Sequence, residues 1–436
     1  MKPLSLFIIL FPLLTNGQNK ILTLEEAIAT ALQNNFDIRL SKNDSMVAAL
    51  DYSFRNAAFL PRLNANAAGV WNNNAQKQRF NDGTQRELND IQSNTYNLGV
   101  QLNWTLFDGM KMFATRDKAK ELVSLGELAI KNQIINTVAA VITNYYNIVR
   151  QKQQLKAVEE QIGLTGERAK LAQYRLDIGV GTKPEVLQSK VDLNAQKSAQ
   201  WQQQTLIAQL KEQLNQVMNV TQVSPYDVSD SIPLNMNVLL IDIMGGIENG
   251  NPALQIARKN ITIAGLTLKE RKAERFPVIN FNSGYSYGRN NNKATVNPFQ
   301  PLFSRNIGRN IGITATIPIL NNFTVKRNIR QAELDIQYQQ LLYDNQKSLL
   351  QLSVLNAYYA YEQQKKTLAL EEENILLAKE NVDIIFQVYK LGATPYIQLR
   401  EAQKSLEDAY NRLIAARYNT KLAETELLRL KGDLVK

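Results

Sequence analysis

The side chains that carry most enzyme chemistry are absent from this sequence. Its 436 residues contain no histidine and no cysteine. Histidine is the commonest general base and transition-metal ligand, and cysteine supplies thiolate ligands, disulfides and lipid-anchored N-termini. No acidic pair stands on the predicted strand ends or loops in both halves of the chain, as a polysaccharide hydrolase with paired carboxylates would need. We therefore expect no catalytic residue, no metal site, no cofactor and no lipoprotein anchor.

Charged residues are abundant, but they are not clustered. The 50 basic and 40 acidic residues leave a formal net charge of +10, which taken alone would suggest a nucleic-acid partner. Along the helical stretches, however, the charges alternate in sign, as they do on solvated helix faces. We therefore expect no nucleic-acid partner.

The first 17 residues have the layout of a secretory signal peptide. Lys2 precedes an apolar run from Leu4 to Leu14, and Thr15-Asn16-Gly17 follows that run. The run is too short to span a bilayer. We expect export, with a mature chain beginning near Gln18. No later segment holds about 18 consecutive apolar residues, which leaves a soluble protein, a peripheral protein or a membrane β-barrel.

The elements that would position any functional residue occur twice. At a shift of 213 residues, Val141–Ile148 lies over Val354–Tyr361, with a Tyr-Tyr pair in each, and Gly179 lies over Gly392. A duplication of this length indicates one large supersecondary unit that has been copied. The expected organisation is a signal peptide at 1–17, a first repeat at 18–223, a linker at 224–240 and a second repeat at 241–436.

Each half changes from a helical period to a period of two. Leu98, Val100, Leu102 and Trp104 face one way, and Gln101 and its alternate neighbours face the other. This alternation predicts two-faced strands of about ten residues, the length of a tilted membrane strand. We expect them at about 62–71, 97–106, 278–287 and 310–319, joined by polar loops at 72–90 and 288–305.

Long helical segments follow each pair of strands. They cover 110–178 and 323–391, and at ~1.5 Å per residue each would be about 100 Å long. Returning helices are expected at 184–220 and 395–431. The second keeps a strict 3,4 spacing of Leu and Ala from Leu399 to Leu430, which is typical of a coiled-coil seam, whereas the first is polar in the middle of its seam.

Four two-faced strands cannot close a barrel by themselves. Because membrane β-structure leaves no open edge, several chains must combine their strands, so this interpretation requires an oligomer. Aromatic residues on these strands would then suit the membrane interfaces: Tyr96, Trp104, Phe107, Phe281, Tyr285 and Tyr287. The Tyr145-Tyr146 and Tyr358-Tyr359 pairs are expected to pack between helices.

In its order of elements the chain resembles the TolC family of outer-membrane efflux proteins over essentially its whole mature length. Leu60-Pro61 and Phe276-Pro277 resemble that family's entry to the strands, and Trp104–Gly109 and Pro318–Asn321 resemble its exit. The resemblance implies a mainly α fold with a transmembrane β-barrel. In that fold a homotrimer forms a twelve-stranded barrel, four strands per chain, which a periplasmic α-helical barrel continues.

The resemblance also implies a function and partners. Such a protein is a passive export channel in the outer membrane that extends into the periplasm. It contacts outer-membrane lipid and works with a periplasmic adaptor protein and an inner-membrane RND or ABC transporter. Two alternatives remain: a soluble periplasmic coiled-coil adaptor or scaffold, which would not need the strands, and a porin, which normally carries eight or more strands per chain.

Site residues follow from the same resemblance. The tip turns Ile178-Gly179-Val180 and Leu391-Gly392-Ala393 resemble those that the family offers to its adaptor, although glycines there also simply reverse the chain. The tunnel constriction would involve Glu185, Tyr389, Gln398 and Glu401. Gln398 departs from the family's acidic pattern, which leaves a single carboxylate ring at Glu401. A solvated acid favoured by the helix dipole is the alternative for Glu401.

Overall fold

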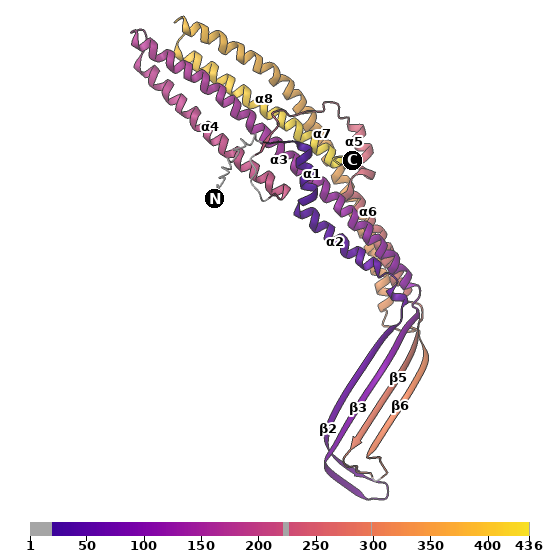
Figure 1. The fold of residues 1–436 in the computed structure, drawn as a ribbon. Helices are drawn as coiled ribbons and strands as arrows, with labels where there is room; N and C mark the ends of the chain where they lie inside the picture. Colours follow the sequence, from indigo (N-terminus) through magenta and orange to yellow (C-terminus); the bar gives the residue numbers. More distant parts are fainter. Residues whose placement is uncertain (1–19, 221–225, 298, 436) are drawn as a thin grey trace, which may run out of the picture. The chain divides into compact units, whose positions relative to one another are not determined.

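The computed structural model describes residues 20–220, 226–297 and 299–435, so the expected signal peptide lies outside the described residues. The chain divides into two compact units (Figure 1). The first comprises Met1–Asn43, Leu128–Gln255 and Asn345–Lys436, and the second comprises Asp44–Glu127 and Ile256–Asp344. Each unit therefore combines segments from both sequence repeats.

The second unit contains an antiparallel sheet in the order β2-β3-β5-β6 (Figure 1). The strands are β2 (Arg62–Arg79), β3 (Gln85–Phe107), β5 (Val278–Asn292) and β6 (Phe303–Thr316). Each strand pairs with the next along the chain, and β3 pairs with β5 across the duplication.

The strands extend well beyond the expected ten residues, so the polar loop predicted at 72–90 is wrong. Residues 72–74 pair with 91–93 and residues 76–79 pair with 85–88, leaving only 80–84 as a turn, and Lys77 forms an ion pair of 2.8 Å with Glu87. The expected loop at 288–305 shortens to 293–302. Alternating hydrophobicity marks a strand only where one face is apolar, whereas backbone pairing continues through polar residues.

Strand β6 starts and ends earlier than the expected 310–319. It begins at Phe303 and ends at Thr316. Pro318 has no backbone N–H to donate to a ladder, which accounts for the end of the strand.

Long helices follow each strand pair. Helices α3 (Lys111–Asp177) and α4 (Lys183–Met218) form one hairpin, and α7 (Thr324–Lys390) and α8 (Tyr396–Lys431) form the other. Their bounds lie within two residues of those expected at 110–178, 184–220, 323–391 and 395–431. The shorter elements are α1 (Leu24–Asn34), α2 (Phe36–Ser53), a 3-10 turn at Ala57–Phe59, α5 (Leu240–Gly250) and α6 (Pro252–Ala273). None of the helices in the described part of the chain combines the length and hydropathy that a membrane crossing needs.

The turn after β3 explains two residues of the Trp104–Gly109 motif, Asp108 and Gly109. Gly109 has a φ of +74°, and a Cβ there would lie 2.4 Å from the carbonyl oxygen of Ala273, so only glycine fits. The preceding Asp108 accepts the backbone N–H of Met112 through Oδ2 at 3.0 Å and so caps the start of α3. Met110 also has a positive φ, and so do the equivalent residues of the second copy, Asn322 and Phe323.

The helical unit is held by seams along the hairpins. Leu368, Ile375 and Val382 of α7 pack against a row of buried residues on α8: Ala402, Leu406, Ala409, Leu413 and Ala416. On α4 the buried seam positions lie near the two ends, at Val186, Ser189, Ile207, Leu210 and Leu214. The glutamines between them are only half-buried, so the polar middle of the α4 seam packs less tightly than the α8 seam.

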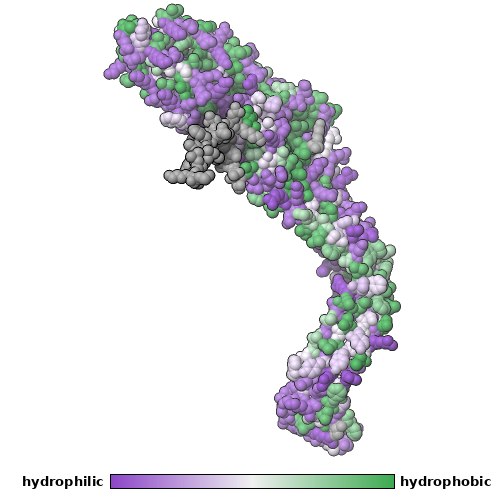
Figure 2. All heavy atoms as spheres, in the orientation of Figure 1, coloured by the Kyte–Doolittle hydropathy of each residue, from purple (hydrophilic) through white to green (hydrophobic). Residues whose placement is uncertain are grey.

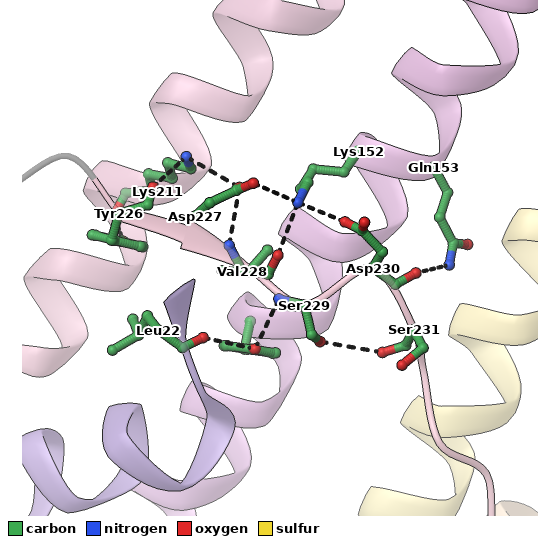
Figure 3. A network of polar contacts seen from close by, with 11 residues as sticks. Leu22, Lys152, Gln153, Lys211, Tyr226, Asp227, Val228, Ser229, Asp230 and Ser231 are labelled. Atoms are coloured by element: carbon green, nitrogen blue, oxygen red, sulfur yellow. Dashed lines mark hydrogen bonds and ion pairs between the residues drawn. The ribbon is translucent and has the colours of Figure 1, made fainter. Parts of the chain in front are cut away.

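The expected linker at 224–240 contains regular structure. Its residues 224 and 225 lie outside the described residues, but β4 (Tyr226–Val228) pairs in parallel with β1 (Lys20–Leu22). Lys152 of α3 anchors this strand (Figure 3). Its Nζ lies 2.8 Å from Oδ2 of Asp227, 2.8 Å from the carbonyl of Val228 and 2.6 Å from Oδ1 of Asp230.

The tyrosine pairs differ between the repeats. Tyr145 and Tyr146 are both buried, and the Tyr145 hydroxyl donates to the carbonyl of Leu22 at 2.9 Å. In the second pair Tyr358 packs against a core cluster, whereas Tyr359 is 66% exposed. The packing role expected for both pairs therefore does not extend to Tyr359 within one copy of the chain.

Candidate functional site

Both helical hairpins reverse at a glycine in the left-handed conformation. Gly179 has a φ of +80° and Gly392 a φ of +76°. After each glycine the next backbone N–H reaches back five residues: Val180 donates to the carbonyl of Arg175 at 2.9 Å, and Ala393 donates to that of Val388 at 3.1 Å. These are Schellman C-caps, so each glycine has a conformational role in its turn.

The tips also present apolar side chains to solvent. Leu391 is 84% exposed, Val180 63% and Ile178 53%, and Ala393 is exposed as well. No atom beyond the adjoining residues lies within 4 Å of a Cβ built on either tip glycine. The two tips therefore combine a tight turn, open space and uncovered apolar side chains, which suits contact with another protein.

Tyr389 connects the two hairpins close to the tips. It is fully buried, and its hydroxyl donates to Oε1 of Glu185 on α4 at 2.9 Å. The guanidinium of Arg175 on α3 lies 5.1 Å from the centre of the Tyr389 ring and donates to the Tyr389 carbonyl at 3.3 Å. Burial, followed by the hydrogen bond to Glu185, raises the pKa of Tyr389, so the phenol stays protonated and remains a donor.

A second polar network, which the sequence does not predict, lies farther along the hairpins. Arg168 of α3 donates to Oδ2 of Asp192 and to Oε1 of Gln403, each at 2.6 Å. Tyr396 of α8 also donates to Asp192 Oδ2, at 3.1 Å, and its ring lies under the Arg168 guanidinium. The network therefore joins α3 and α4 to α8.

The sequence carries no local signal for this network. The polar seam residues of α4 form other contacts, from Gln196, Gln200 and Gln203 to Glu407, Glu159 and Gln151. The network itself could not be predicted, because Asp192 and Gln403 are more than 200 residues apart in the sequence.

The other two residues expected at the tunnel constriction, Gln398 and Glu401, belong to neither network. Gln398 is exposed and accepts a hydrogen bond from the hydroxyl of Thr394. Glu401 is exposed, and within the described residues its side chain makes no hydrogen bond or ion pair. The structure thus brings Glu185 and Tyr389 together and leaves Gln398 and Glu401 facing solvent in a single chain.

The sheet of the second unit has two chemically distinct faces. Residues directly opposite one another in a ladder share a face. Leu98 lies opposite Tyr287, Trp104 opposite Phe281, and Phe281 opposite Ile313, which defines the apolar face. The other face is dominated by amides and hydroxyls, among them Asn64, Asn66, Gln101, Asn103, Asn282, Asn310 and Thr314.

The expected aromatic residues mostly share the apolar face. Tyr96, Trp104, Phe281, Tyr285 and Tyr287 occupy it by register, and Phe107 follows a bulge next to Thr105. Trp71 joins them, with its ring centroid 5.9 Å from that of Tyr96. Whether they form membrane girdles stays a prediction. In the described residues no group of three or more carboxylates is placed to hold a metal ion.

Comparison with known proteins agrees with this arrangement. A family model described as "Outer membrane efflux protein" matches residues 27–220 and 246–433. The outer membrane efflux protein BepC of Brucella suis is 19% identical over 94% of this chain and 86% of its own length. The cation efflux system protein CusC of Escherichia coli K12 is 21% identical over 95% of this chain and 86% of its own length.

Solved structures share the fold. The crystal structure of the Campylobacter jejuni CmeC outer membrane channel has a TM-score of 0.75 to this chain. It is 15% identical in sequence, and the match covers 94% of this chain and 85% of that one. The helical hairpins and the four-stranded sheet are therefore those of an outer membrane channel fold.

Proposed function

Because this chain belongs to the outer membrane efflux protein family, we propose that three copies of it form one export channel across the outer membrane and into the periplasm. The observation that carries this proposal is the sheet of the second unit. It is antiparallel, it has one apolar and one polar face, and both of its edge strands, β2 and β6, are open.

Closing these edges supports the stoichiometry. In a bilayer every backbone polar group must be satisfied, so β6 of one copy must pair with β2 of the next. Three copies of four strands would make a twelve-stranded barrel with the apolar face toward lipid and the amide-rich face toward water. A soluble coiled-coil adaptor has no need for such a sheet.

The helical hairpins would extend the channel through the periplasm. Figure 2 shows hydrophobic and hydrophilic residues interspersed over their surface. One copy leaves large apolar side chains of α7 uncovered, including Leu352, Leu370, Leu376, Leu377 and Ile384. Burial against neighbouring copies would remove these side chains from water.

The tips would receive the partners. We propose that Ile178, Gly179, Val180, Leu391, Gly392 and Ala393 contact a periplasmic adaptor, which links the channel to an inner-membrane RND or ABC transporter. Contacts such as Tyr389 with Glu185 would hold the tip closed until the adaptor favours an open arrangement of the hairpins. The channel would perform no catalytic step.

The first test is the state of the extracted protein. We expect detergent to be required to extract it from outer membranes. Light scattering with detergent correction should give the mass of a trimer, and boiling should change the mobility of the protein on a gel. Planar bilayers should then show discrete channel conductance. A water-soluble monomer, or a trimer without conductance, would contradict the proposal.

A further inference from the structure

Three arginines interrupt the apolar face of the sheet. Arg289 on β5 lies directly opposite Arg305 on β6 and opposite Tyr96 on β3, and Arg309 lies opposite Tyr285. Because ladder partners share a face, all three arginines lie on the face that carries Leu98, Tyr287 and Ile307. Their end of the sheet is the one with the connections 80–84 and 293–302.

These guanidinium groups have no anionic partner. All three side chains are exposed, and the described structure places no carboxylate within ion-pair distance of them. Arg289 only packs over the ring of Phe303, at 5.5 Å. Strands β2, β5 and β6 contain no acidic residue. Of the two acids in β3, Glu87 pairs with Lys77 and Asp90 accepts from Gln92.

A neighbouring copy would not supply the missing charge. In the proposed trimer the open edge of β6 meets β2 of the next chain, and β2 holds only neutral and basic residues from Arg62 to Arg79. Charged side chains on a lipid-facing strand are unfavourable unless they reach the interface or a counter-charge. The arginines therefore need an acceptor that comes from outside the protein.

The height of the arginines on the sheet indicates where that acceptor lies. Tyr96, opposite Arg289, is eight residues along β3 from Trp104. At ~3.3 Å per residue and the usual strand tilt, this separation is roughly 20 Å of height, close to the apolar thickness of an outer-membrane barrel. Arg289 and Arg305 thus lie near the upper edge of the apolar band. Arg309 lies deeper, and its long side chain can extend upward to the same level.

We propose that Arg289, Arg305 and Arg309 bind the phosphate groups of lipid A in the outer leaflet. This inference rests on the proposed function, which places the 80–84 and 293–302 connections outside the cell. A guanidinium group binds phosphate oxygens through two parallel N–H donors, and basic clusters at the membrane surface bind anionic head groups. The aromatic neighbours Tyr96, Tyr285 and Phe303 provide the apolar floor against which the acyl chains of the same lipid pack.

The test is lipid retention by the detergent-extracted trimer, measured by native mass spectrometry. The probes are bisphosphorylated lipid A, dephosphorylated lipid A, phosphatidylglycerol and inorganic phosphate. We expect the unaltered trimer to retain bisphosphorylated lipid A at least about tenfold better than each of the other three probes. The combined variant R289Q/R305Q/R309Q should lose this preference and retain both forms of lipid A equally.

A matched variant controls for the loss of three charges. R62Q/K326Q/R327Q removes the same charge from one residue on the polar face and from two exposed residues in the first turn of α7. It should keep the preference for bisphosphorylated lipid A. The inference is overturned if the unaltered trimer shows no preference, if phosphatidylglycerol is retained as well as lipid A, or if the triple arginine variant keeps the preference. Failure to obtain a trimer would instead count against the proposed function, because the trimer's mass is read in the same spectrum.

Discussion

The hydroxyl of Tyr389 on α7 donates a 2.9 Å hydrogen bond to Glu185 on α4, and this contact joins the two helical hairpins beside their tips. The bond is made within one chain, between a fully buried Tyr389 and a half-buried Glu185. Hydrogen bonds to a charged acceptor are roughly twice as strong as neutral ones. Its removal is therefore a direct way to ask whether the hairpins separate when the channel opens.

Replacing Tyr389 with Phe should favour the open tip. The substitution keeps the ring and removes a bond of ~1.5–3 kcal/mol, so the closed-to-open ratio should fall by roughly tenfold or more. Planar-bilayer recordings should show a higher conductance or open probability. Y174F, on an exposed tyrosine of α3, is the control. Unchanged recordings for Y389F would mean that this contact does not hold the tip.

Bulky replacements at the tip glycines should impair efflux and spare insertion. Gly179→Val and Gly392→Val place a branched side chain at positive φ and distort the turn that presents the apolar tip residues. We expect normal amounts of trimer in the outer membrane together with at least a severalfold loss of export from cells.

Two further variants distinguish the loss of an apolar contact surface from strain in the turn backbone. Val180→Asp and Leu391→Asp leave the turn conformation intact and change only an exposed apolar side chain, so they should also reduce efflux if the tips contact an adaptor. If the glycine variants instead fail to insert, the glycines serve only to reverse the chain.

Replacing Asn251 with Ala should destabilise the helical unit more than replacing it with Asp. Asn251 Oδ1 accepts the N–H of Leu254 at 3.0 Å as the N-cap of α6, and Nδ2 donates to the carbonyl of Leu430 at 2.9 Å. Ala loses both bonds, for about 2 kcal/mol, whereas Asp keeps the cap. Asn35 makes the corresponding contacts, to Ile38 and Val217, so Asn35→Ala should behave alike. Thermal unfolding followed by circular dichroism measures both, and equal losses for Ala and Asp would contradict the cap.

Lys152→Met should lower stability at neutral pH and much less in acid. Burial opposes the charged forms, but hydrogen bonds prevail: those from Lys152 and the Val228 N–H lower the pKa of Asp227 below 3.8, and those to Asp227 and Asp230 raise the pKa of Lys152 above 10.5. The Asp227 contribution is thus present above pH 3.8 and lost as pH falls through its folded-state pKa. The Lys152 contribution is present below pH 10.5 and lost as pH rises through its own folded-state pKa.

Because Asp227 is partly exposed, we expect only about 1 kcal/mol at pH 7. Unfolding temperatures at pH 7 and at pH 3 measure the difference, with K156M, an exposed lysine one turn along α3, as control. A loss that is equal at both pH values would exclude the ion pair as its cause.

Glu401→Gln should reduce the preference of the channel for cations. Three copies of this exposed carboxylate would form a ring at the constriction, whereas the polar face of the sheet is built almost entirely from neutral amides and hydroxyls. We expect the cation-to-anion permeability ratio, taken from reversal potentials in a salt gradient, to fall by roughly threefold. E373Q makes the same charge change elsewhere on an exposed helical position. If both variants or neither shift the ratio, Glu401 is only a solvated acid at the start of α8.

Strand ends are not predictable where pairing does not depend on the side-chain pattern. Apolar alternation stops at Trp71 and Tyr287, yet β2 continues to Arg79 and β5 to Asn292. Backbone ladders extend through Asn-rich and Gln-rich segments because N–H and C=O groups pair whatever side chain they carry. Likewise, the linker predicted from prolines contains β4, which is ordered by Lys152 from a distant helix.

The sequence by itself determined the class of fold and the family, because these depend on local periodicity repeated twice. The period of two in the strands, the 3,4 spacing of the α8 seam and the glycines at both tips are each visible within a few tens of residues. Only the tertiary structure decided which polar groups meet. Arg168 donates a hydrogen bond to Gln403 because of the way the hairpins pack. Arg289 lies opposite Arg305, with no acidic partner, because of the strand register. The first contact joins segments 235 residues apart, and the second depends on strand register across the 293–302 connection, so no local pattern encodes either.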